Sequence, residues 1–124
     1  SSTSSRGATT AIVNNQLYAN PSTGQLSAKT FYASSDKRLK ENIVEYVPEH
    51  SILELPVYKY NFTDDTTKIE HIGCLAQDLQ TICPEIVSEG DNGYLSINES
   101  KIVYLLLNEV KKLKAEVREL KAKI

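Results

Sequence analysis

A serine hydroxyl and a lysine amine are the side chains of this sequence best suited to covalent chemistry. They belong to Ser35 and Lys40, within the run SDKRLKENI at residues 35–43. A serine beside a lysine that is held neutral is a minimal nucleophile and base for acyl transfer. Two nearby cations favour the neutral amine, whereas the neighbouring carboxylates favour the charged one. The spacing alone is more typical of an ordinary basic helix start than of a catalytic pair, so its meaning depends on the rest of the chain.

No other set of residues forms a recognisable reaction centre. His50 and His71 are too far apart to indicate a site, and we expect both to be structural. Cys74 and Cys83 lack the spacing of a zinc site, so buried free thiols are favoured over a disulfide or a reactive thiol. The sequence contains no glycine-rich phosphate loop. We therefore expect neither a metal nor a cofactor.

Composition limits the classes of protein that remain. With 124 residues and 40% hydrophobic content, the chain has material for one modest core. Its net charge of −2 is not typical of nucleic-acid binding. The longest apolar run, residues 102–107, is too short to span a membrane or to be a signal peptide. Because the chain contains no methionine, we expect a fragment or a processed product.

The first 35 residues differ in kind from the rest. Residues 1–34 contain only two charged side chains and are rich in small polar residues, so they cannot bury enough apolar surface to fold alone. Short β-prone runs nevertheless occur, separated by the turn-like NPSTG at residues 20–24. These runs lie at residues 11–13, 17–18 and 26–32. They favour the end of a β-structure shared between several chains, with a loose tail as the alternative.

Residues 36–97 carry the signals of a small α+β domain. The period-two run at residues 56–62 predicts a half-buried strand. Residues 75–82 predict a helix that Pro84 stops. Residues 86–87 and 94–97 predict a hairpin with Asn92-Gly93 at its turn.

Residues 98–124 form the clearest element, a helix for which Ser96 or Asn98 is a suitable N-cap. Its apolar residues follow a strict 3-4 spacing, which predicts a coiled coil rather than a helix packed only on its own domain. We call these seven residues the seam; they are Val103, Leu106, Val110, Leu113, Val117, Leu120 and Ile124.

The charges that flank the seam fit a parallel bundle in register. Glu109 at heptad position g would face Lys114 at position e of a neighbour, and Glu116 would face Lys121. The seam has β-branched residues at a and Leu at d, a pattern that favours two strands.

Several ordered motifs resemble the intramolecular chaperone auto-processing domain of phage tail spikes, tail fibres and neck appendage proteins. The resemblance begins at SDKRLKENI and continues to the helix that contains VKKL at residues 110–113. Between these lie PVYKY at 56–60, HIGCLAQD at 71–78, PEIV at 84–87 and GYLSIN at 93–98. Upstream, LSAKTFYAS at residues 26–34 resembles the end of a fibre stalk.

This resemblance implies a homotrimer that folds the upstream segment into a triple β-helix stalk and then releases itself. It implies Ser35 and Lys40 as the catalytic dyad and Ser35–Asp36 as the bond that is cut. It also implies assembly in the host bacterial cytoplasm, with the upstream part retained in the virion tail. The partners would be the other two copies and the stalk, not nucleic acid or membrane. The expected domains are residues 1–35, 36–97 and 98–124.

Bond geometry does not decide which peptide bond is cut. A serine hydroxyl that attacks the preceding carbonyl closes a five-membered ring and cuts Ser34–Ser35, whereas attack on its own carbonyl needs a strained four-membered ring. A cut at Ser35–Asp36 therefore needs Ser35 of another chain, an activated water or help from Asp36. The competing functions are a trimerising tip that is never released and a tip that binds a host receptor.

Overall fold

The computed structural model describes residues 12–14 and 17–124. The chain divides into two compact units, of which the first ends at Val44 and the second comprises Glu45–Ile124. The expected boundaries at residues 35/36 and 97/98 remain predictions.

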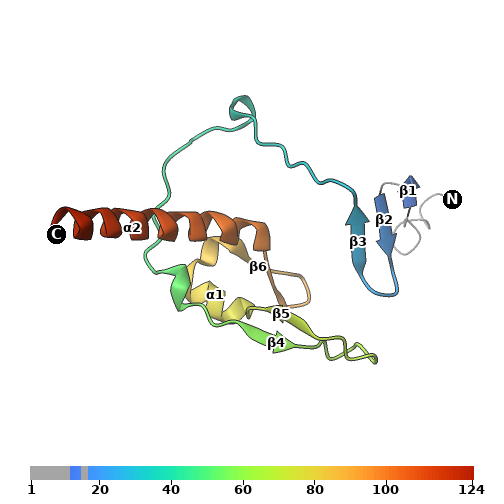
Figure 1. The fold of residues 1–124 in the computed structure, drawn as a ribbon. Coiled ribbons are helices and arrows are strands. Elements are labelled where there is room, and N and C mark those ends of the chain that lie inside the picture. The colour runs from blue at the N-terminus through green and yellow to red at the C-terminus, as the bar shows by residue number, and fades with distance from the viewer. Residues whose placement is uncertain (1–11, 15–16) are drawn as a thin grey trace. The chain divides into compact units, whose positions relative to one another are not determined.

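The first unit contains a small antiparallel sheet with the order β1-β2-β3 (Figure 1). Its strands are β1 Ile12–Asn14, β2 Leu17–Asn20 and β3 Gln25–Ala28. The predicted turn at residues 20–24 is confirmed. The Asn20 side chain accepts hydrogen bonds from the Ser22 and Thr23 amides, and Gly24 takes a φ of 77° that L side chains rarely adopt.

The predicted strands of this unit are found with shifted ends. β3 stops at Ala28, whereas the sequence predicted a strand over residues 26–32. The expected strand at 11–13 appears as β1 at 12–14, and Ala11 lies outside the described residues. Phe31 and Tyr32 follow β3 and are exposed.

The second unit is a small α+β fold built from two strand pairs and two helices. β4 Tyr58–Tyr60 pairs with β5 His71–Gly73, and β6 Val87–Glu89 pairs with β7 Leu95–Ile97, both antiparallel. Helix α1 is Ala76–Ile82 and helix α2 is Ile102–Ala122. The short 3₁₀ turns η3 Ile52–Glu54, η4 Pro84–Ile86 and η5 Glu99–Lys101 connect them.

Most local predictions for this unit are confirmed. α1 ends at Ile82, two residues before Pro84. The β6–β7 hairpin closes through Gly93, whose φ is 84°. Of the predicted N-caps, Asn98 holds the N-cap position of η5, which leads directly into α2, but its side chain makes no capping hydrogen bond. Lys101 holds the cap position of α2 itself. The Asn98 side chain instead accepts a hydrogen bond from the Ser100 hydroxyl at 2.6 Å.

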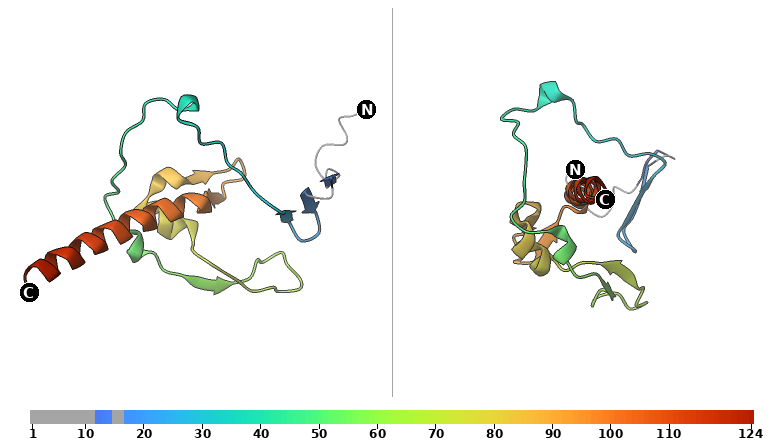
Figure 2. Two further views of the ribbon diagram at one scale, coloured as in Figure 1. Left: turned by 45° about the horizontal axis from the view of Figure 1, so that its top comes forward. Right: turned by 60° about the vertical axis from the view of Figure 1, so that its left-hand side comes forward.

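The core of this unit is small and lies between α1, η3, η4 and the first turns of α2. Its buried residues are Ile52, Leu79, Ile82, Cys83, Ile86 and Leu105. Only Leu105 comes from α2, so one face of that helix packs on its own domain. Figures 1 and 2 show the C-terminal part of α2 projecting beyond the other elements of this unit, and its residues from position 111 onward are all exposed.

Candidate active site

The segment after Ser35 is organised by a carboxylate. Asp36 is the N-cap of the 3₁₀ turn η2, Lys37–Leu39, and its Oδ1 accepts the Arg38 amide at 2.8 Å. The Arg38 guanidinium donates to both Asp36 oxygens, at 3.1 and 2.9 Å. This two-point contact, together with the amide, holds the pKa of Asp36 below its ordinary value. Asp36 is therefore a structural cap of the turn.

The same turn brings the two predicted catalytic side chains together. The Lys40 amide closes η2 by donating to the Lys37 carbonyl at 3.1 Å. The chain thereby folds back, and Lys40 Nζ lies 2.7 Å from Ser35 Oγ, to which it donates a hydrogen bond. The contact joins side chains five positions apart.

This arrangement can support proton transfer between hydroxyl and amine. A general base must lie within hydrogen-bond reach of the proton that it removes, and the Ser35–Lys40 distance meets this condition. In the observed direction lysine is the donor, so the catalytic form requires a neutral amine with serine donating instead. Both side chains are exposed in the single chain.

The histidines and cysteines take other positions. The His71 ring stacks on Tyr60 at 5.6 Å and meets the edge of Phe62 at 5.1 Å, which makes it part of an aromatic cluster. Cys83 is buried and Cys74 is half-buried, and both are free thiols. Burial raises the pKa of the Cys74 thiol. The expectation of buried thiols is confirmed for Cys83 alone.

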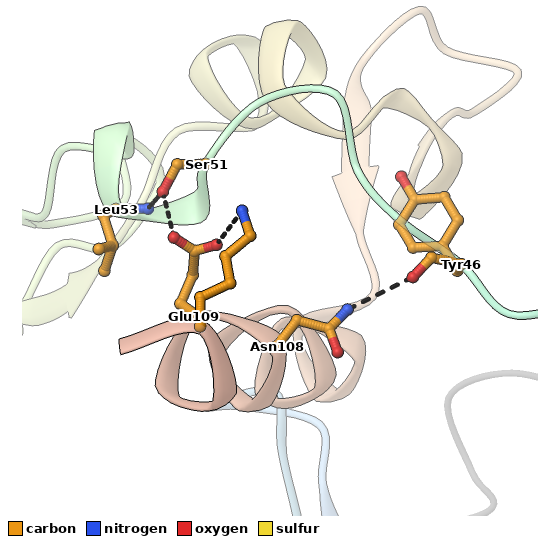
Figure 3. A network of polar contacts seen from close by, with 6 residues as sticks. Tyr46, Ser51, Leu53, Asn108 and Glu109 are labelled. Atoms are coloured by element: carbon orange, nitrogen blue, oxygen red, sulfur yellow. Dashed lines mark hydrogen bonds and ion pairs between the residues drawn. The ribbon is translucent and has the colours of Figure 1, made fainter. Parts of the chain in front are cut away.

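Polar contacts that tie distant segments of the second unit together were not predicted from the sequence. The Tyr46 hydroxyl lies 3.3 Å from both Cys83 Sγ and a Glu85 carboxylate oxygen. The same residue's carbonyl accepts a hydrogen bond from the Asn108 amide nitrogen on α2 at 3.4 Å (Figure 3). The first contact raises the pKa of Tyr46, chiefly through the hydrogen bond with Cys83.

A third contact of this kind, between Ser51 and Glu109, changes the interpretation of Glu109. Its carboxylate accepts a hydrogen bond from Ser51 Oγ at 2.7 Å and pairs with Lys112 at 3.2 Å (Figure 3). The Ser51 hydrogen bond is the main cause that lowers the pKa of Glu109. Glu109 therefore already has two partners in its own chain, where the sequence had predicted only a neighbour's Lys114.

The seam is exposed along its whole length. Its seven residues are between 42% and 102% exposed, whereas Leu105 on the same helix is 5% exposed. An apolar stripe of this length on a projecting helix is typical of a surface that packs against another chain.

Neither a metal nor a membrane-spanning element is indicated in the part of the chain that the structure describes. Residues 12–14 and 17–124 contain no group of three or more His, Cys, Asp or Glu side chains placed to hold a metal ion. Among the same residues, no helix has both the length and the apolar character needed to cross a membrane.

The turn η2 and the first part of the α+β unit fall in the range recognised by a family of chaperone domains. Residues 35–88 match the model of a peptidase family described as the chaperone of endosialidase. The match supports an endosialidase-type intramolecular chaperone domain in this part of the protein, as the sequence motifs predicted. The match begins at Ser35 and ends at Ser88, before β7 and α2, although the resemblance had been expected to extend to residue 124. No curated protein and no solved structure matches the chain.

Proposed function

We propose that this protein trimerises through α2, helps three copies of its upstream segment to fold into a fibre stalk, and then cuts itself free. The cut uses Ser35 as nucleophile and Lys40 as base. The matched family supports the chaperone and peptidase parts of this proposal. Assembly takes place in the host cytoplasm, after which the stalk stays in the virion tail. The observation that carries the proposal is the 2.7 Å contact between Lys40 Nζ and Ser35 Oγ, located at the first residues of the family match.

Assembly is the step that makes the dyad reactive. A lysine acts as a base only in its neutral form, which burial and nearby cations favour. Since Ser35 and Lys40 are exposed in the single chain, packing of the three copies is what would cover them. The dyad therefore stays inactive until the stalk has been brought together.

The chemistry is an acyl transfer followed by hydrolysis. Lys40 removes the Ser35 hydroxyl proton as Oγ bonds to the carbonyl carbon of the scissile peptide. The protonated lysine then returns that proton to the leaving amine as the C–N bond breaks. Water hydrolyses the resulting ester and restores the serine. Attack on the Ser35 carbonyl by another copy's serine releases a chain that begins at Asp36, whereas attack on the preceding carbonyl releases one that begins at Ser35.

The first test is denaturing electrophoresis of the protein joined to its stalk. The wild type should give two fragments and Ser35→Ala one, because alanine lacks the attacking oxygen. Ser34→Ala is the matched control, since it removes a neighbouring exposed hydroxyl and should leave cleavage intact. The first residue of the released fragment, read by mass spectrometry, identifies the bond. Full cleavage of Ser35→Ala would exclude Ser35 as the nucleophile.

The same experiment distinguishes the main alternative, a trimerising domain that is never released. The exposed seam supports trimerisation in either case. A wild-type protein that assembles and stays whole would favour the uncut form.

Chaperoning has its own expected result. A stalk produced without residues 36–124 should be largely insoluble, because strand pairing between chains is slow and unpaired edges aggregate meanwhile. Solubility and sedimentation of the truncated stalk measure this, beside the full-length Ser35→Ala protein as the uncut control. A soluble trimeric stalk made without those residues would contradict the proposal.

A further inference from the structure

We propose that the turn η3 forms a second wall of the interface between copies, and that the groove between Leu53 and α2 receives Lys114 of a second copy. This inference rests on the proposed assembly through α2. The heptad pattern places the interface on the helix alone, whereas this inference extends the interface to the globular part of the domain.

The turn η3 is held firmly beside the helix. Ile52 at its start is 5% exposed and belongs to the core. Ser51, just before it, accepts the Leu53 amide at 3.1 Å and donates its hydroxyl to Glu109 at 2.7 Å (Figure 3). Anchored on both sides, the turn leaves the Leu53 side chain 71% exposed.

A groove of about 320 Å³ lies between Leu53 and the exposed face of α2. Its apolar lining is Leu53 with the seam residues Leu106, Val110 and Leu113. Its charged lining is Glu109, Glu116 and Lys112, of which Lys112 pairs with Glu109. The groove therefore continues the seam sideways, toward heptad position g. A neighbouring helix that packs on the seam must meet it.

Heptad geometry and charge select the occupant. In a parallel bundle the g residue Glu109 faces the neighbour's e residue five positions later, which is Lys114. A lysine suits this groove, because its stem packs on apolar side chains while the ammonium reaches a carboxylate. Lys114 is exposed and forms no salt bridge within residues 12–14 and 17–124.

The Ser51 contact prepares Glu109 for this partner. Ser51 holds one carboxylate oxygen, so the side chain is already ordered before assembly. The other oxygen pairs with Lys112, whose side chain is 59% exposed. The Glu109 side chain is only 11% exposed, but the Lys112 end of the pair lies largely in solvent, so Lys114 of a second copy can share the carboxylate. The turn would thus fix how each globular part sits on the coil.

Sedimentation equilibrium tests whether η3 and Leu53 form part of the interface between copies. Leu53→Ala should weaken assembly by about tenfold or more, since several buried methyl groups are lost at every interface. Ile72→Ala is the matched control, because Ile72 is 75% exposed on β5 and does not line the groove. Protection of the buried Cys83 thiol from a thiol reagent verifies that each variant is folded. Equal assembly of Leu53→Ala and wild type overturns this inference alone, whereas a monomeric wild type overturns the proposed function with it.

Disulfide trapping tests whether Lys114 of a second copy lies beside Leu53. Chains carrying Leu53→Cys, refolded together with tagged chains carrying Lys114→Cys, should form a mixed disulfide between copies under mild oxidation. Ile72→Cys in place of Leu53→Cys should not. Trapping at position 72 as efficient as at position 53 contradicts the proposed docking.

Discussion

Lys40→Arg should assemble normally and remain uncut, with cleavage slowed by about 10²–10⁴-fold. Arginine keeps the positive charge and can still donate a hydrogen bond to Ser35. It cannot remove the serine proton, because a guanidinium does not deprotonate near neutral pH. The fraction of cut chains over time, measured by denaturing electrophoresis of the protein joined to its stalk, reports the rate.

The chain offers a matched control for this substitution in the same turn. Lys37 lies in η2, three positions before Lys40, and Lys37→Arg makes the same chemical change without touching the base. It should be cut at the wild-type rate. If Lys40→Arg also were cut at that rate, the amine would have no role as a base, and the contact at 2.7 Å would be only structural.

Features set by neighbouring residues were the ones that the sequence predicted well. The β6–β7 hairpin follows from Asn92-Gly93, and the end of α1 from Pro84, because backbone preferences at those positions act locally. The proximity of Ser35 and Lys40 was expected from the family motif. Its structural cause, the cap formed by Asp36 and Arg38, also lies within the same short turn.

Contacts between distant segments were not predictable in this way. Ser51 and Glu109 are 58 positions apart, and Tyr46 and Cys83 are 37 apart. Such pairs leave no periodic signal, since tertiary packing alone brings them together. At heptad position g, a glutamate that binds its own domain has the same pattern as one that binds a neighbour. The sequence therefore predicted an interface role for Glu109 and missed its contact to Ser51.

Val110→Asp should give a monomer at micromolar concentration. Val110 is 60% exposed in the single chain, so aspartate there disturbs no core residue. In the assembled bundle, however, the carboxylates of all copies would meet in an apolar seam, where an unpaired buried charge costs roughly several kcal/mol. Sedimentation equilibrium measures the loss. Arg118→Asp is a control that introduces the same residue on the exposed part of α2, away from the seam, and it should leave assembly intact.

The same substitution tests whether cleavage depends on assembly. Val110 lies on α2, far along the chain from Ser35 and Lys40, and changes neither catalytic group. If assembly is what covers and orients the dyad, then Val110→Asp joined to its stalk should remain uncut, as Ser35→Ala does. Cysteine protection at Cys83 verifies that the monomer is folded. A folded monomer that cuts itself efficiently would contradict the dependence of cleavage on assembly. The dyad would then act within one chain, with the turn at residues 36–40 sufficient to position it.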